Sequence, residues 1–268
     1  MAAMNTPTLP ALSRTEVHAA DLDFQLAYRI RSGKTPSIVF IHGLGCSQDS
    51  FAHVFSLREF QDRSLLIFDL PGFGHSSRPE SFCYSMPDLA RVTLALLDAL
   101  QLHDVHLVGH SMGGAVAVLL ARDLGSRLVS LTSVEGNHLG SDCSLSREIA
   151  RVSYDAFTKR MFPVLDTLMS ESEKGYFILE RASAQALYEC SRSLVTWSDR
   201  GSLMQDFLAM DRQRFYVYGQ KNSGLETVAR LQDHVPMASI AGSSHFPMNQ
   251  NPTAFYRALH SFLAPLDS

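Results

Sequence analysis

The chain is short of cysteine, tryptophan and net charge. Its 268 residues include four cysteines and one tryptophan, and 23 Lys and Arg stand against 27 Asp and Glu for a formal charge of −4. Binding to a phosphate backbone requires a clustered basic surface, which this weakly acidic composition does not supply. We therefore expect no nucleic-acid partner.

The few cysteines form no metal or disulfide pattern. No C-x-x-C pair or histidine at zinc-binding spacing accompanies Cys46, Cys83, Cys143 or Cys190. A chain of this length can bury a sizeable core without covalent staples. The prediction is four buried thiols in a reducing compartment and no metal, with a secreted disulfide pair as the alternative.

Long apolar runs are also missing. No segment reaches the ~18 apolar residues of a membrane span, and residues 1–12 lack the apolar core of a signal peptide. A hydrophobic content of 46% with 19% charged residues is typical of a globular protein. We expect a cytoplasmic protein without a membrane partner; the sequence carries no signal for an oligomeric state.

Short apolar segments alternate with helical ones along most of the chain. Expected are a hairpin over 17–29, strands at 37–41, 64–68, 105–108, 128–134, 215–218 and 237–240, and helices at 87–100, at 112–124 and after Pro252. Such alternation is typical of βαβ units, which build a mostly parallel sheet with helices on both faces. The predicted class is α/β.

The alternation stops between Gly136 and Met210, where apolar residues recur at helical spacing. Because this stretch interrupts one sheet, we predict a helical cap over residues 136–210, lying on the C-terminal edge of the sheet. Residues 1–135 and 211–268 then form the core domain.

A G-x-S-x-G motif, Gly109 to Gly113, lies between a predicted strand and a predicted buried helix. This is the setting of a nucleophile elbow. A serine on so tight a turn projects its hydroxyl, the flanking glycines avoid backbone clashes, and the helix N-terminus offers free N–H groups. We predict that Ser111 is the nucleophile; a glycine-rich turn with an incidental serine is the alternative.

A serine hydroxyl needs a base, and histidine has a suitable pKa. His245 follows the last predicted strand, at the same sheet edge as Ser111. Acyl transfer also needs donors for the oxyanion. We expect these to be the backbone N–H groups of Leu44 and Met112, although a plain strand–helix turn also explains the glycines beside Leu44.

Four stretches resemble, in order, the signature segments of the α/β-hydrolase fold: His42-Gly43, Asp69 to Ser76, Gly109 to Gly114 and Gly242 to Phe246. Outside the cap, the chain is similar to small capped serine hydrolases, near bacterial esterases and related lactone- and C–C-bond-cleaving enzymes. The resemblance implies a twisted eight-stranded sheet, a triad in chain order Ser, acid, His, and no metal or organic cofactor. A serine at the nucleophile position disfavours the aspartate-nucleophile members, dehalogenases and epoxide hydrolases.

The triad acid departs from the commonest family pattern, G-x-x-D, because Asn222 occupies the aspartate position after Gly219. In a Ser-His-Asp triad this change costs about 10⁴ in turnover. Some branches of the superfamily place the acid at the end of the strand after the nucleophile helix, where this chain has Glu135. We predict Glu135 as the acid; Glu226 or another carboxylate, or no working acid, are the alternatives.

Four residues are weaker candidates for a substrate pocket, because core packing or a solvated loop explains them as well: His42, Phe73, Asn137 and His138. The predicted function is hydrolysis of a small to medium, mostly apolar carboxylic ester through an acyl-enzyme. A lactonase or acyltransferase with the same triad is one alternative. A catalytically silent α/β-hydrolase that binds a ligand is another.

Overall fold

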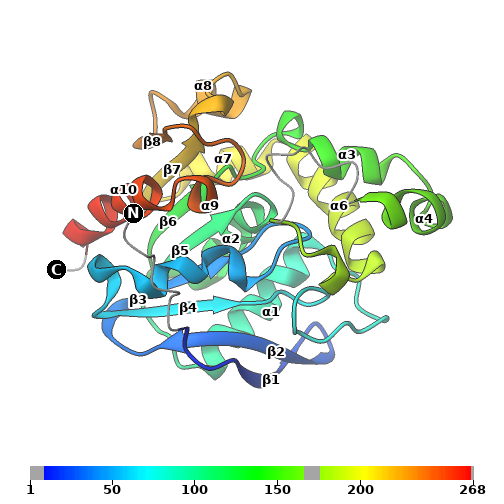
Figure 1. Ribbon diagram of the computed structural model, residues 1–268, viewed down its shortest axis with the longest axis horizontal. Coiled ribbons are helices and arrows are strands. Elements are labelled where there is room, and N and C mark those ends of the chain that lie inside the picture. The colour runs from blue at the N-terminus through cyan, green and yellow to red at the C-terminus, as the bar shows by residue number, and fades with distance from the viewer. Residues whose placement is uncertain (1–8, 166–175, 267–268) are drawn as a thin grey trace, which may run out of the picture.

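A single sheet runs through the molecule in the computed structural model, which describes residues 9–165 and 176–266 (Figure 1). Its eight strands lie in the order β1-β2-β4-β3-β5-β6-β7-β8. They are β1 (Ser13–Ala19), β2 (Leu22–Arg31), β3 (Lys34–Ile41), β4 (Arg63–Phe68), β5 (Val105–His110), β6 (Leu128–Val134), β7 (Gln213–Gly219) and β8 (Met237–Ile240). β2 is antiparallel to β1 and β4, and all other neighbours are parallel. The predicted mostly parallel sheet and N-terminal hairpin are confirmed.

Helices cover both faces of this sheet. The α-helices of the described residues, those at one end of the sheet included, are α1 (Met86–Ala99), α2 (Met112–Leu124), α3 (Ser144–Ala150), α4 (Tyr154–Ala156), α6 (Ala184–Asp199), α7 (Ser202–Ala209), α8 (Glu226–Leu231), α9 (Pro247–Gln250) and α10 (Pro252–Leu263). α1, α2 and α7 pack on one face, and the 3-10 segment η1 (Gln48–Ser56) packs on the other with α9 and α10.

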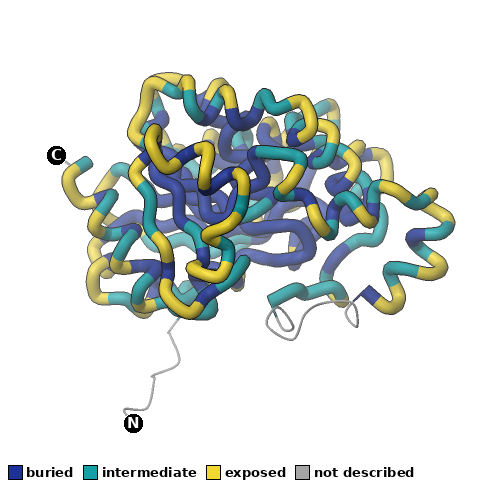
Figure 2. The backbone as a smooth tube through the Cα atoms, turned by 90° about the horizontal axis from the view of Figure 1, so that it is seen from above, coloured by how far each residue is buried: buried dark blue, intermediate teal, exposed yellow. Residues whose placement is uncertain are grey.

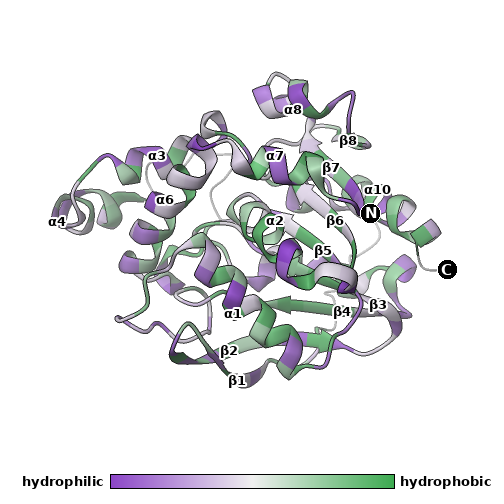
Figure 3. Cartoon of the chain, turned by 180° about the vertical axis from the view of Figure 1, so that it is seen from behind, coloured by the Kyte–Doolittle hydropathy of each residue, from purple (hydrophilic) through white to green (hydrophobic). Residues whose placement is uncertain are grey.

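The two halves of the core follow from the alternation of side chains along the strands. In β3, Val39 and Ile41 belong to the cluster on the α1 and α2 face, whereas Ile38 and Phe40 belong to the α10 face. A strand covered on both faces is apolar throughout, which is why these segments are continuous hydrophobic runs. Burial is concentrated in the centre (Figure 2), and hydrophilic residues gather on the outer helices (Figure 3).

The segment between β6 and β7 is helical, as predicted. It contains η4 (Gly140–Asp142), α3, α4, α6 and α7, and α6 packs against α3 and α7. α3, α4 and α6 stand together at one end of the sheet (Figure 1). The assignment of 136–210 as a separate cap stays a prediction, and its residues 166–175, like residues 1–8 at the N-terminus, lie outside the described residues.

The cysteine prediction needs one correction. All four cysteines are free thiols, and Cys46, Cys143 and Cys190 are buried. Cys83 is exposed, because it lies in the loop before α1, where its thiol contacts Asp88. Within the described residues, no helix has both the length and the hydropathy needed to cross a membrane.

The start of α2 lies very close to the ends of β3 and β5. A Cβ built on Gly113 would lie 2.2 Å from the carbonyl oxygen of Ile41, and one on Gly109 would lie 2.4 Å from that of Gly113. Real Cβ atoms do not come this close to backbone oxygens. Glycine at both positions therefore lets the helix start directly above the strand ends.

Replacing Gly113 with alanine should lower the free energy of unfolding by about 2 kcal/mol, because α2 must move away from β3. This loss outweighs the ~1 kcal/mol by which alanine favours a helix over glycine. Urea denaturation measures the change. Gly224→Ala is the matched control, since nothing lies within 4 Å of its Cβ position. Equal stability of the two variants would contradict the crowding argument.

Candidate active site

Ser111 occupies the sharp turn between β5 and α2. Its backbone has φ 53° and ψ −120°, in the left-handed half of conformational space that non-glycine residues rarely adopt. Its N–H donates to the carbonyl of Val134 on the neighbouring strand at 2.9 Å. Such strain persists only where the surroundings impose it, and it commonly marks a functional residue.

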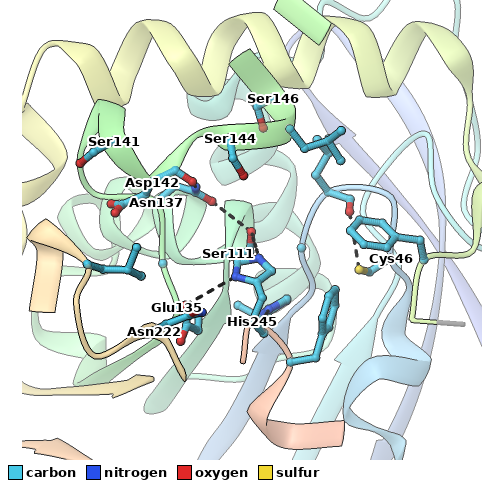
Figure 4. A pocket seen from close by; sticks show the side chains of 18 of the residues that line it. Cys46, Ser111, Glu135, Asn137, Ser141, Asp142, Ser144, Ser146, Asn222 and His245 are labelled. Atoms are coloured by element: carbon cyan, nitrogen blue, oxygen red, sulfur yellow. Dashed lines mark hydrogen bonds and ion pairs between the residues drawn. The ribbon is translucent and has the colours of Figure 1, made fainter. Parts of the chain in front are cut away.

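His245 reaches this serine from the loop between β8 and α9. Its Nε2 lies 3.0 Å from Ser111 Oγ (Figure 4), and its side chain is 28% exposed. His110 Nε2 lies 2.8 Å from the His245 carbonyl oxygen. Burial lowers the pKa of His110 well below its ordinary value, so the ring stays neutral and Nε2 donates. This hydrogen bond holds the loop that carries His245 against the end of β5.

Glu135 approaches the other nitrogen of His245. It directly follows β6 with a φ of 48°, and its side chain is 1% exposed. Its Oε2 lies 3.6 Å from His245 Nδ1, a contact longer than a hydrogen bond. Catalytic contacts in unliganded sites are often this loose and tighten with substrate. With Nδ1 facing the carboxylate, Nε2 has its lone pair available for the proton of Ser111.

Asn222 contacts this same carboxylate. It lies in η8 (Gln220–Asn222), directly after β7, and its Nδ2 donates to Glu135 Oε2 at 2.9 Å. The N–H of Gly219 donates to Oε1 at 2.6 Å. At the position where the commonest family pattern has an acid, this chain therefore has a donor to an acid from the adjacent strand. The alternative acid, Glu226, accepts hydrogen bonds from Ser141 and Arg230 instead.

The two expected oxyanion donors lie beside the nucleophile. Leu44 lies in the turn after β3, and it lines, with Gly43, the same cavity as Ser111. Met112 is the first residue of α2, where a backbone N–H has no acceptor within the helix. Both positions fit the predicted oxyanion hole, which stays a prediction.

Three of the pocket candidates are not among the residues that line the cavity beside Ser111, and their side chains are fully buried. His42 is fully buried, its Nε2 accepts from the N–H of Leu70 at 3.0 Å, and its ring meets Phe73 edge-on. His138 is also fully buried, with its ring stacked on Phe207 and Nε2 2.7 Å from Ser133 Oγ. His42, Phe73 and His138 are therefore packing residues under the site.

The fourth candidate, Asn137, does face the site. It is 3% exposed, so the alternative of a solvated loop is wrong. Its Oδ1 lies 3.0 Å from Ser111 Oγ, and its Nδ2 donates to the carbonyl of Asp142 at 2.7 Å (Figure 4). The sequence placed it only near the end of a strand, and the partner that orients its amide is a main-chain atom five residues away.

Ser111, His245, Glu135 and Asn137 all border one cavity of about 620 Å³, within the range of small-molecule sites. The apolar lining residues include Leu44, Cys46, Phe177 and Phe246. The start of the inserted segment contributes a second, polar group, which the sequence analysis did not predict: Ser141, Asp142, Ser144, Ser146 and Glu148. Neither Lys nor Arg occurs among the described residues that line it. Within residues 9–165 and 176–266, no cluster of three His, Cys, Asp or Glu side chains could hold a metal ion.

Comparisons with known proteins find relatives over part or most of the chain. A relative from Mycoplasma pneumoniae named as an esterase/lipase is 30% identical over 142 residues, 53% of this chain and 47% of its own length. The match thus spans about half of that relative. The pimeloyl-[acyl-carrier protein] methyl ester esterase of Aeromonas hydrophila is 35% identical over 259 residues, 87% of this chain and 97% of its own.

The fold has solved counterparts. An esterase from Thermogutta terrifontis superposes with a TM-score of 0.77 at 18% identity, covering 96% of this chain and all of that one. The model of the Alpha/beta hydrolase family matches residues 38–258, most of the sheet and all of the candidate site. The chain therefore belongs to the alpha/beta hydrolase family.

Proposed function

We propose that the protein hydrolyses uncharged carboxylic esters through a covalent acyl-enzyme, with Ser111 as nucleophile, His245 as base and Glu135 as the acid that orients it. The observation that carries this proposal is the pair of contacts on one imidazole: Ser111 Oγ at 3.0 Å from Nε2 and Glu135 Oε2 at 3.6 Å from Nδ1. These two contacts join the imidazole to a nucleophile on one side and to an acid on the other, as a serine triad requires.

In the first half of the reaction, Ser111 Oγ attacks the ester carbon while its proton passes to His245 Nε2. The negative charge that develops on the carbonyl oxygen is taken up by the N–H groups of Leu44 and Met112. Collapse of the tetrahedral intermediate breaks the bond to the alcohol, which leaves with the proton from His245. Water then releases the acid by the reverse sequence, and Glu135 stabilises the imidazolium in both halves.

The charge of the cavity supports an uncharged substrate. Glu135, Asp142 and Glu148 are its carboxyl groups, and Arg151 pairs with Glu148 at 2.6 Å at the outer edge. An anionic substrate would meet these groups without a cationic partner among the described lining residues. The apolar wall suits an acyl chain, and the serine-rich wall suits a polar alcohol portion.

Ser111→Ala should abolish covalent labelling by a fluorophosphonate and lower the turnover of p-nitrophenyl butyrate on the order of 10⁶-fold, because no other group can form the acyl bond. Intact-protein mass spectrometry and absorbance follow the two events. A wild-type protein that neither labels nor cleaves p-nitrophenyl esters of any chain length would instead indicate a silent, ligand-binding member of the family.

Glu135→Gln should lower turnover by about 10⁴, since His245 loses the charge that fixes its tautomer. Asn222→Ala should cost only ~10-fold, because the N–H of Gly219 still holds the carboxylate. Asn222→Asp should not raise turnover, because it replaces the amide that now lies 2.9 Å from Glu135 Oε2 with a second carboxylate, and the two like charges repel. Steady-state kinetics decide: near-wild-type turnover of Glu135→Gln, or a gain for Asn222→Asp, would remove Glu135 from the triad.

Two esters of equal acyl length test the charge argument. The p-nitrophenyl monoester of succinate should have a kcat/KM at least ~10-fold below that of p-nitrophenyl butyrate, because its carboxylate would meet like charges in a cavity whose described lining contains no Lys or Arg. Glu148→Gln should narrow the difference. Equal rates for both esters would show that the cavity carboxyl groups do not select the substrate.

A further inference from the structure

Ser111 has two acceptors for its single hydroxyl proton. His245 Nε2 and Asn137 Oδ1 each lie 3.0 Å from Ser111 Oγ, from two different sides (Figure 4). A serine hydroxyl carries one hydrogen, so it donates to one of them at a time. The reaction proposed above uses only the contact with His245 and leaves Asn137 unexplained.

The orientation of the Asn137 amide is fixed by its other end. Nδ2 lies 2.7 Å from the carbonyl oxygen of Asp142, and a flipped amide would bring two carbonyl oxygens to that distance. The turn that presents this carbonyl is itself fastened, because the Asp142 carboxyl group accepts from the N–H groups of His138 and Leu139 and from Thr227. Oδ1 of Asn137 therefore faces Ser111.

Acylation of Ser111 changes the surroundings of this oxygen. Once Oγ is esterified it has no proton to donate, and Asn137, 3% exposed, keeps an acceptor that needs a donor. His245 Nε2, having passed its proton to the departing alcohol, is an acceptor as well. In the acyl-enzyme, Asn137 Oδ1 and His245 Nε2 are therefore two acceptors beside the acyl bond, and the Ser111 hydroxyl no longer donates to either.

We propose that Asn137 positions the water that cleaves the acyl-enzyme. A water molecule has two O–H groups and can donate one to Asn137 Oδ1 and the other to His245 Nε2. Its oxygen attacks the acyl carbon, and the second proton moves to His245. The bond from carbon to Oγ then breaks, Oγ takes this proton back, and the acid leaves; Asn137 neither gains nor loses a proton.

This arrangement favours hydrolysis over transfer to an alcohol. An alcohol has a single O–H, so it can satisfy His245 or Asn137 but not both, and binding it in place of water leaves one buried acceptor without a donor. Asn137 thus selects the acyl acceptor. The inference rests on the proposed function, since it requires an acyl-enzyme on Ser111.

The test separates the two halves of the reaction in Asn137→Leu with p-nitrophenyl butyrate. Acylation should persist, seen as fluorophosphonate labelling near the wild-type rate and a burst of about one p-nitrophenol per protein. Steady-state turnover should fall on the order of 10²-fold, the effect of misplacing a reacting group. With methanol added, the share of methyl ester among the products should rise. Asn137→Ala, which adds no bulk, gives the same readouts if the leucine variant does not fold.

Asn249→Leu is the matched control, because it removes a similar amide tether, to the carbonyl of Ser50 at 3.1 Å, away from Ser111. It should retain turnover within about twofold. Labelling and burst that fall in parallel with turnover in both Asn137 variants would assign Asn137 to support of the elbow and overturn the proposal, as would unchanged turnover. A wild-type protein without labelling or ester cleavage would reject the proposed function itself.

Discussion

Glu135 is a carboxylate enclosed almost completely by protein, and burial of such a charge is unfavourable unless donors surround it. One continuous segment, residues 219–222, donates twice, through the N–H of Gly219 and the amide of Asn222. The β8–α9 loop brings His245 Nδ1 to 3.6 Å from the same carboxylate. The carboxylate therefore joins the end of β6, the end of β7 and the β8–α9 loop. The geometry around Ser111 depends on this one buried group.

The hydrogen bond to Glu135 explains why an asparagine fits at position 222. An aspartate there would set two carboxylates against each other, and like charges at that distance cannot both ionise. With the carboxylate of Glu135 at the end of β6, the segment after the adjacent strand β7 supplies a neutral donor, and an asparagine side chain is one. The departure from the commonest family pattern and the presence of Glu135 are two parts of a single arrangement.

Much of the fold could be predicted because its signals are local. The helix at 112–124 and the strands at 128–134 and 237–240 have the predicted bounds, since Ser111 and Gly125 delimit an apolar helix and turn residues flank the strands. β3 starts at Lys34 rather than Ser37, because Lys34 pairs with Arg63, a contact made through tertiary structure.

For the candidate site, the sequence could predict only which residues follow which strands. Sheet topology brings residues after β5, β6 and β8 to one edge, which sufficed for Ser111, Glu135 and His245. It does not give the direction of a side chain: His42 and His138 also follow strands, yet both point into the core. The role proposed for Asn137 depends on a main-chain oxygen of Asp142, and no pattern of side chains encodes that contact.

The segment between β6 and β7 enters and leaves the sheet at two adjacent parallel strands. The pairing of β6 with β7 is made outside this segment, so a change of its length or sequence need not alter the strand register. The tether from Asn137 to Asp142 moves the usable junction downstream, however. A graft that begins between Asn137 and Asp142 would remove the carbonyl that orients the Asn137 amide, whereas one that begins after Asp142 would change the inserted segment and keep this contact.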